Sequence, residues 1–486
     1  MSGPGADPDT EPDPRRWRAL AVCVCALYIT LLDVSIVAVA LYSIGQGIGA
    51  GPAQLQWVVS GYALAFGMVP IIGGRLGDDR GRRFLLLVGI GAFVVFSAAV
   101  GLAPSPGVLV AARVLQGLAG GLINPQVSGL VQQLFPGWER GRAFGLIGTS
   151  VGIATATGPV IGGAIIALGG AQYGWRLCFL INVPIGIAAF VLCRRWLPGP
   201  PARVGRARRL DLPGAALLAA AVLVLLFPAV QYDAGHDARL ALLLAPALAL
   251  MAAFVGWERG PARQRGHPLI DLGLFRIRSY ADGVALALLF FCAYTGTPLV
   301  LALFLQDGLG FTPLESGLTA SAYAVGVTVA APVAGQLLPR AGSRVLLAGL
   351  ALFTTGVAAA GLTGAVAAGR VEPTAVALLL AGPLLVAGLG GGSVITPNQA
   401  LSLAEVDVRG GSTAGGTLQT SQRIGNAIGA AVITAVFYAA SRDAGGGVDR
   451  QQAYGQAYGL ALAVSVGFAL GAGLLAWHGV RRARGR

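Results

Sequence analysis

Hydrophobic residues along this 486-residue chain occur in long runs, separated by short segments rich in arginine, glycine and proline. A run of about 20 apolar residues is long enough for an α-helix to cross the hydrocarbon core of a bilayer. Fourteen runs approach that length and predict an all-α polytopic membrane protein with fourteen transmembrane helices. The predicted spans are residues 19–41, 55–76, 84–103, 108–131, 143–168, 178–197, 212–230, 240–257, 282–305, 315–338, 345–364, 374–400, 412–438 and 455–477.

Two short motifs recur eight predicted helices apart and indicate an internal repeat. The segment GRLGDDRGRR (74–83) follows the second span and GQLLPRAGSR (335–344) follows the tenth, with glycine, leucine, glycine and arginine at equivalent positions. In the same order, ERGRAFG (139–145) precedes the fifth span and VRGGSTAG (408–415) precedes the thirteenth. Six helices, an inserted pair and six more helices explain this spacing. Two such halves place a cavity at their interface, near the middle of the membrane.

The repeat also predicts how the chain is divided. The segments are a disordered, acid- and proline-rich cytosolic tail (1–14), an N-terminal six-helix bundle (15–197), a cytosolic linker (198–211), the inserted helix pair (212–257), a second cytosolic linker (258–281), a C-terminal six-helix bundle (282–480) and a basic cytosolic tail (481–486).

Composition and charge support this membrane topology. Hydrophobic residues make up 55% of the chain and charged residues only 11%, whereas a soluble domain carries about 25% charge. All 34 basic residues are arginine, and 27 of them fall in the loops and tails on one side of the predicted spans. By the positive-inside rule, that side and both termini are cytosolic in a cell or inner membrane. Because the arginines are dispersed over short loops, the net charge of +13 does not indicate a nucleic-acid partner.

Three charged residues fall deep inside predicted spans. Asp33 lies in the middle of LYITLLDVSIVAVAL (27–41), where a carboxylate costs at least about 2.5–3.5 kcal/mol. At a rise of about 1.5 Å per residue, Arg113 and Arg423 reach nearly the same depth from their own ends of the membrane. A static ion pair between the halves would explain this arrangement. Because charged residues inside a membrane usually mark transport pathways or proton relays, we favour a functional role.

The fifth predicted span, GLIGTSVGIATATGPVIGG (145–163), is dense in glycine. Gly148 and Gly152 are four residues apart, as are Gly158 and Gly162, so each pair exposes backbone on one side of the helix. Close helix packing of the small-xxx-small kind is the simpler interpretation. Pro159 removes one backbone donor and predicts a local bend.

Five motifs in order resemble those of the fourteen-span drug:proton antiporters in the major facilitator superfamily. They are LDVSIVAVAL (32–41), GRLGDDRGRR (74–83), RVLQG (113–117), GPVIGG (158–163) and WRLCFLINVPIG (175–186). The resemblance implies proton-driven export by alternating access, with Asp33 as the proton-linked carboxylate and Arg113 as its partner. It further implies a conformational latch of Gly74, Asp78, Gly81 and Arg82, and an antiporter helix that restricts leak, shaped by Gly148, Gly152, Gly158, Pro159, Gly162 and Gly163.

A substrate cavity is predicted where the polar stripe of the thirteenth span meets the other half. Gln419, Arg423 and Asn426 recur there at helical spacing, and no acidic residue accompanies them. We therefore expect neutral, anionic or monocationic amphiphiles rather than dications. Core packing is an equal alternative for the aromatic members of the predicted lining, which comprises Tyr62, Phe66, Gln116, Asn124, Tyr294, Tyr323, Gln419, Arg423 and Asn426.

The leading hypothesis is a proton-coupled exporter of amphipathic drugs, antibiotics or toxic natural products, whose partners are the substrate, protons and the lipid bilayer. A transporter for one dedicated metabolite, such as an amino acid or siderophore, is the alternative. A membrane enzyme or signalling scaffold is a third class, but the sequence has no phosphate-binding loop, nucleophile elbow or zinc-protease helix. The three histidines lie in polar linkers or at a helix end, so no metal or other cofactor is expected.

Overall fold

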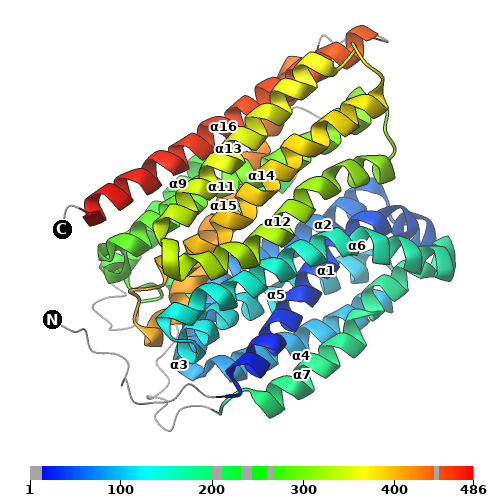
Figure 1. Ribbon diagram of the computed structural model, residues 1–486. Coiled ribbons are helices and arrows are strands. Elements are labelled where there is room, and N and C mark those ends of the chain that lie inside the picture. Colours follow the sequence, from blue (N-terminus) through cyan, green and yellow to red (C-terminus); the bar gives the residue numbers. More distant parts are fainter. Residues whose placement is uncertain (1–13, 200–210, 231–243, 261–267, 443–447, 485–486) are drawn as a thin grey trace.

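The computed structural model describes residues 14–199, 211–230, 244–260, 268–442 and 448–484, and within these ranges the chain is helical without a β-strand. Two groups of long helices lie side by side (Figure 1). The first contains α1 (Arg16–Ile48), α2 (Pro52–Met68), α3 (Pro70–Arg80), α4 (Arg82–Gly101), α5 (Pro106–Leu134), α6 (Gly137–Leu180) and α7 (Asn182–Trp196). The second contains α11 (Arg278–Leu303), α12 (Pro313–Ala341), α13 (Ser343–Ala367), α14 (Pro373–Ser402), α15 (Gly411–Ser441) and α16 (Val448–Arg484).

Eleven of the described helical segments are long and apolar enough to cross a membrane. A twelfth span forms if α2 and α3, which meet at an angle of 45°, cross together. The long α6 counts with α7 as two spans, Gly137–Gly170 and Gln172–Trp196, because Gly170 adopts a positive φ of 73° and breaks the helix. The fold is therefore an all-helical membrane fold of eleven or twelve such spans in the described part of the chain, and the full count of fourteen stays a prediction.

The inserted pair consists of α8 (Leu212–Val230) and α9 (Leu244–Arg259). Residues 231–243 lie outside the described residues, so the predicted start of the second inserted span is not covered. Leu218 and Val222 of α8 and Phe254 of α9 pack in one apolar cluster with Leu64 of α2 and Ala427 of α15. The pair thus covers one side of the seam between the two groups of helices.

The internal repeat has a structural counterpart at two helix junctions. Gly81 between α3 and α4, and Gly342 between α12 and α13, both have positive φ angles, 103° and 53°, a region that favours glycine. Just before these turns, Gly74 lies against the backbone of Ser412 in α15, and Gly335 lies against that of Gly141 in α6. In both cases a side chain at the first glycine would clash, so glycine allows the two groups of helices to touch at the same end of the molecule.

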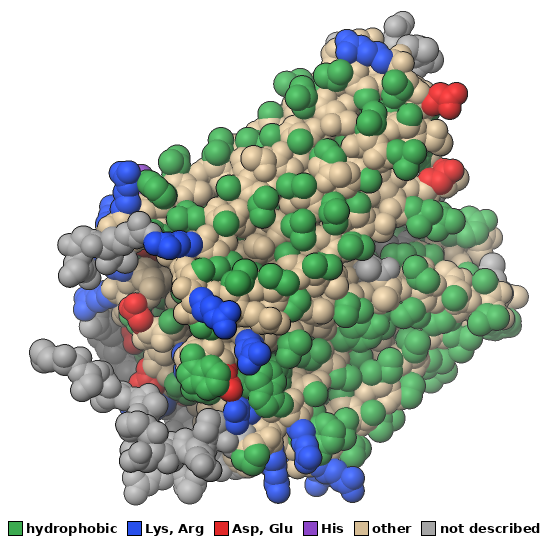
Figure 2. All heavy atoms as spheres, in the orientation of Figure 1, with side chains coloured by type: hydrophobic (Ala, Val, Ile, Leu, Met, Phe, Trp, Pro, Cys, Tyr) green, Lys and Arg blue, Asp and Glu red, His purple; other side chains and the backbone are tan. Residues whose placement is uncertain are grey.

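The surface is that of a membrane protein. Apolar side chains cover the visible flank of the helices, whereas arginines gather at one end (Figure 2). Leu168, Leu378 and Val160 are 89%, 78% and 72% exposed, which a soluble surface rarely tolerates in such numbers. The chain accordingly has the helices and the apolar flank of a multi-pass membrane protein.

Candidate functional site

Asp33 is held at the centre of a buried cluster of hydrogen-bond donors. Its side chain is 0% exposed, and its Oδ2 lies 2.5 Å from Nη1 of Arg113, which is 1% exposed. Oδ1 accepts hydrogen bonds from Gln116 Nε2 at 3.0 Å and from Asn182 Nδ2 at 2.8 Å. Each of these three partners is a donor, so both carboxylate oxygens are satisfied by hydrogen bonds inside the protein.

Two members of this cluster were not predicted from the sequence. Asn182, at the first turn of α7, lies in the segment WRLCFLINVPIG, which by itself does not single it out. Ser97 of α4 accepts a hydrogen bond from Gln116 at 2.8 Å and so orients the amide toward Asp33. The available signal was polarity, because Asn182 and Ser97 are polar residues inside apolar helices and both are 0% exposed.

Arg113 links this cluster to open space between the helices. Its Nε donates to the carbonyl of Val58 at 3.0 Å, and its guanidinium lies 4.3 Å from the ring centroid of Tyr62. Tyr62 and Arg113 line a cavity of about 270 Å³ formed by α1, α2, α5 and α15, here called the Arg113 cavity. Asp33 itself does not line this cavity, so the carboxylate reaches it only through its partner.

A second cavity, of about 210 Å³, lies next to the first and is here called the Gln419 cavity. Leu31, Arg423 and Asn426 line both cavities and form the boundary between them. The Gln419 cavity lies between the two groups of helices. Its lining includes Leu27, Asn124, Ser128, Phe144, Gly148, Phe291, Tyr294, Thr295, Gln399, Gln419 and Gln422.

The polar stripe of α15 borders these cavities. The guanidinium of Arg423 lies 4.6 Å from the ring centroid of Phe66. Gln419 Nε2 donates to Ser128 Oγ at 3.2 Å across the seam, and the Asn426 side chain accepts a hydrogen bond from Thr295. No carboxylate lines either cavity among the described residues, so Arg423 is the positive charge at their shared boundary without a neighbouring acid.

Two residues of the predicted lining, Gln116 and Tyr323, border neither of these two cavities. Gln116 is 0% exposed and points at Asp33, because it follows Arg113 by three residues and shares its helix face. Tyr323 packs behind Tyr294, 6% exposed, with its hydroxyl 3.5 Å from the Tyr294 carbonyl. The remaining predicted lining residues, Tyr62, Phe66, Asn124, Tyr294, Gln419, Arg423 and Asn426, border one cavity or both.

The predicted latch residues meet the first turn of α15 at the arginine-rich end. Asp78 Oδ2 accepts hydrogen bonds from the backbone N–H and the hydroxyl of Thr413, both at 2.8 Å, and Oδ1 accepts the N–H of Ser412 at 3.1 Å. Gly410, at the N-cap position of α15, has no side chain to offer. Asp78 therefore caps a helix of the other half with a full negative charge, which the helix dipole also favours.

Arg82 fixes the orientation of Asp78. Its Nη2 donates to Asp78 Oδ1 at 2.8 Å and to the carbonyl of Val408, and its Nη1 donates to the carbonyl of Gly129 at 2.7 Å. The equivalent positions in the second half are Pro339 and Ser343, which cannot form such a pair. This capping interaction therefore exists on one side of the pseudo-repeat only.

Comparison with known proteins shows the family to which the chain belongs. The sequence model of the Major Facilitator Superfamily matches residues 23–430. The chain belongs to this superfamily. It is 37% identical over 441 residues to a probable actinorhodin transporter of Streptomyces coelicolor, covering 90% of this chain and 75% of that protein. It is 33% identical over 425 residues to the tetracenomycin C resistance and export protein of Streptomyces glaucescens, covering 86% and 75%.

A solved structure shows the same fold. The crystal structure of the human organic anion transporter MFSD10 (TETRAN) matches with a TM-score of 0.65 at 15% identity, covering 94% of this chain and 100% of that one. With relatives that are antibiotic and drug exporters of the major facilitator superfamily, the chain is a transporter, and the enzyme class is excluded.

The glycines of the predicted antiporter helix, α6, make close contacts with two different helices, α12 and α1. Gly148 and Gly152 lie against Ala331 and Thr328 of α12, whereas Gly158 lies against Ser35 of α1. Gly162 makes a looser contact with Ile36 of α1, a β-carbon at Gly163 would have no atom within 4 Å, and Pro159 is exposed. Close packing therefore explains the first three glycines, and the N-terminal half of α6 is the part that touches the opposite bundle.

Proposed function

We propose that this chain is a proton-coupled antiporter that exports amphipathic drugs, antibiotics or toxic natural products by alternating access. The observation that carries the proposal is the position of Arg113, which pairs with the buried Asp33 and also lines a cavity. A proton on the carboxylate is thereby connected to the space that a substrate would occupy.

The coupling follows from the donors that surround Asp33. Protonation removes the negative charge to which Arg113, Gln116 and Asn182 donate, so these hydrogen bonds become weaker. Arg113 loses its counter-charge at the same time and turns more of its charge toward the Arg113 cavity. Asn182 Oδ1, which has no partner among the described residues, accepts the new O–H if its amide turns over.

The cavity chemistry supports a neutral or anionic aromatic amphiphile as substrate. Arg423 supplies a positive charge, several amides supply hydrogen bonds, and Phe66, Phe291 and Tyr294 supply aromatic surface. A dication would meet no carboxylate in either cavity among the described residues, so its desolvation would be uncompensated. The names of the two relatives, an actinorhodin transporter and a tetracenomycin C exporter, fit export of natural products.

Export of one dedicated product is the second candidate, because both relatives are named for a single compound. Susceptibility profiling of cells with and without the protein separates the two. Hypersensitivity to many unrelated compounds on deletion supports multidrug export, and a phenotype limited to one compound supports a dedicated carrier.

We further propose that the arginine-rich end faces the cytosol, following the positive-inside rule. The first turn of α1 and the last turn of α16 lie at that end (Figure 1). The contact between Asp78 and α15 at that end supports a state closed toward the cytosol as part of this proposal.

Transport in proteoliposomes tests the coupling. Asp33→Asn removes the titrating group but keeps one acceptor oxygen, so we expect substrate flux driven by a pH gradient to stop while the protein stays folded. Glu372→Gln, an exposed acid at the start of α14, is the matched control and should transport normally. Gradient-driven flux that survives Asp33→Asn would overturn the proposal.

A further inference from the structure

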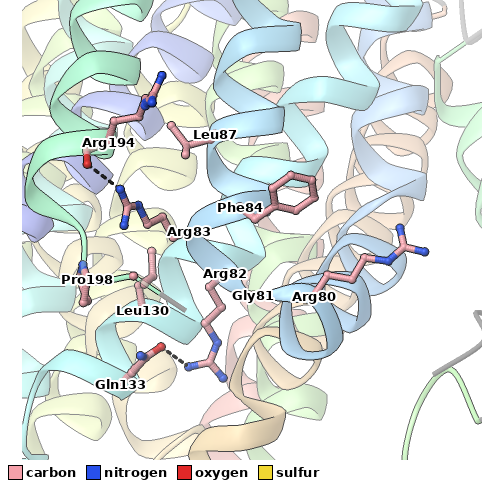
Figure 3. Close-up of a pocket in the computed structure, with 11 residues that line it drawn as sticks. Arg80, Gly81, Arg82, Arg83, Phe84, Leu87, Leu130, Gln133, Arg194 and Pro198 are labelled. Atoms are coloured by element: carbon pink, nitrogen blue, oxygen red, sulfur yellow. Dashed lines mark hydrogen bonds between the residues drawn. The ribbon is translucent and has the colours of Figure 1, made fainter. Parts of the chain in front are cut away.

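A pocket outside the transport pathway lies at the arginine-rich end, between the ends of α5 and α7 and the first turn of α4 (Figure 3). Its volume is about 370 Å³. Arginines and apolar side chains share its wall. The lining residues are Arg80, Gly81, Arg82, Arg83, Phe84, Leu87, Leu130, Gln133, Arg194, Pro198 and Gly199.

The positive charge of this pocket exceeds what nearby acids neutralise. Arg82 is paired with Asp78, and the neighbouring Asp79 is paired with Arg75 at 3.2 Å. Arg80, Arg83 and Arg194 have no carboxylate within ion-pair distance among the described residues. A negatively charged ligand is what this charge distribution favours.

Two of the arginines, Arg83 and Arg194, lie next to each other, whereas Arg80 points to the other side of α4 (Figure 3). Arg83 Nη2 donates to the carbonyl of Arg194, in the last turn of α7, at 2.6 Å. Figure 3 shows the Arg83 and Arg194 side chains on the same side of α4 as Leu87. A guanidinium that is anchored at one end keeps its other N–H groups available, and such donors bind phosphate oxygens well.

Apolar surface continues from the arginines toward the membrane. Phe84, in the first turn of α4, is 55% exposed, and Val88 one turn further is 41% exposed. On α7, Val191 is 45% exposed. An acyl chain that follows these side chains would stay in contact with the protein while its headgroup lies among the arginines.

We propose that this pocket binds the phosphate of an anionic phospholipid from the adjacent leaflet. Basic pockets between membrane helices on the cytosolic side are a known way to hold such headgroups, so the assignment rests on the proposed orientation. The apolar wall favours a lipid over a soluble phosphate, because only a lipid brings chains that cover Phe84 and Val88.

The pocket shares one residue, Arg82, with the latch, so a bound lipid would affect the contact between the two bundles. Arg82 lines the pocket and also holds Asp78 and the carbonyl of Val408. The pocket therefore keeps this shape as long as Arg82 holds α4 next to the start of α15. A ligand that binds one conformation shifts the population toward it, so the lipid stabilises the conformation closed at the arginine-rich end.

Lipid binding by the purified full-length protein tests this inference without any transport assay. We expect phosphatidylglycerol to be retained as a one-to-one adduct in native mass spectrometry and to raise the thermal midpoint more than phosphatidylcholine does. Arg83→Gln with Arg194→Gln should weaken retention by about tenfold or more, because two charged donors are lost. Arg194→Gln alone, which keeps the Arg83 hydrogen bond, should have an intermediate effect and guards against misfolding of the double variant.

Two controls make the outcome decisive. Arg340→Gln with Arg344→Gln removes two exposed arginines from the equivalent loop of the second half and should leave retention unchanged. Inorganic phosphate should compete weakly. Equal loss of lipid retention in both double variants would show that general surface charge causes the binding and would overturn the proposal. Full displacement of the lipid by inorganic phosphate would overturn it as well. Neither result depends on Asp33, so failure here is distinct from failure of proton coupling.

Discussion

The carboxylate of Asp78 caps the first turn of a helix through Thr413, which lies 335 residues further along the chain. Both hydrogen bonds from Thr413 measure 2.8 Å, and the N-cap residue of that helix is a glycine. The residue that caps α15 therefore comes from the other bundle, and the cap is also a contact between the two bundles. Opening this end of the transporter must leave the first N–H groups of α15 without that partner.

Removing the cap should loosen the arginine-rich end. For Asp78→Ala we expect the free energy of unfolding to fall by about 1–2 kcal/mol, the usual range for a lost N-cap. Amide hydrogen exchange should rise in the peptide that covers 408–418. Asp78→Asn should exchange more slowly than Asp78→Ala, because the amide oxygen still accepts an N–H. Asp79→Ala is the control, since its partner Arg75 lies on the same helix; equal exchange in the two alanine variants would refute the cap.

Asn182 should be needed for transport because it holds Asp33 in place. In Asn182→Ala the Asp33 carboxylate loses one of its donors, so we expect the free energy of unfolding to fall by about 1–3 kcal/mol and gradient-driven transport to slow. Asn398→Ala, another buried asparagine outside the cluster, should lose a similar amount of stability in thermal melting but keep its transport rate in proteoliposomes. Equal transport rates in the two variants would show that Asn182 has only a structural role.

Arg423 should discriminate between substrates by charge. Arg423→Gln keeps hydrogen-bonding capacity at the boundary of the two cavities but removes the positive charge. We expect affinity for an anionic aromatic substrate to fall about tenfold, or about 1.4 kcal/mol, and affinity for its neutral analogue to change little. Binding can be followed by tryptophan fluorescence with such a matched pair of compounds. Arg370→Gln, in an exposed loop, serves as the control, and equal losses for both compounds would contradict the charge preference.

Two glycines of α6 should respond oppositely to a larger side chain. Gly152 lies against Thr328 of α12, whereas nothing lies within 4 Å of a β-carbon at Gly163. Gly152→Val should push the bundles apart and abolish transport or folding, with a cost of several kcal/mol as for other overpacked sites. Gly163→Val should be tolerated within about 1 kcal/mol. Thermal midpoints and transport rates of the two variants check this, and a severe defect in Gly163→Val would point to a role outside packing.

Glu258 should make stability depend on pH. It follows the predicted span 240–257, is 2% exposed, and accepts a hydrogen bond from the N–H of Leu269 at 3.0 Å. Burial raises its pKa to about 7, with a smaller contribution from Asp211 and opposing ones from the Leu269 hydrogen bond and Arg75. Between pH 4.5 and about 7 the unfolded chain releases this proton while the folded protein keeps it, so the free energy of unfolding falls as pH rises.

A thermal-melting series tests this dependence. The thermal midpoint of the wild-type protein should decline from about pH 5 to about pH 7. Above about pH 7, Glu258 should cause no further decline. Glu258→Gln should flatten that decline and raise the midpoint at about pH 8, because a neutral side chain never acquires the buried charge. Glu405→Gln, an exposed acid in the described chain, should keep the wild-type profile. A decline that persists unchanged in Glu258→Gln would assign it to another group.

Much of the fold could be predicted because the bilayer restricts the chain to long apolar helices. Every backbone polar group in a lipid environment must be satisfied within its own segment, so length and apolarity suffice to place a helix. The kink at Gly170 and the turns at Gly81 and Gly342 also follow local chemistry, because only glycine adopts their positive φ readily. Apolarity alone does not place the second inserted span, because α9 has 16 described residues and a bilayer-spanning helix needs about 20.

The chain's own sequence thus determined the helices, the arginine-rich end and the common depth of Asp33, Arg113 and Arg423, because these depend on local spacing and on the cost of charge in lipid. Tertiary structure alone decided how each helix is rotated. That rotation turns Gln116 toward Asp33 instead of the cavity, brings Asn182 to the same carboxylate from 149 residues away, and divides Arg82 between a helix cap and a basic pocket. Rotation is set by the packing of side chains from distant segments, and the hydrophobic pattern of one helix contains no information about its neighbours.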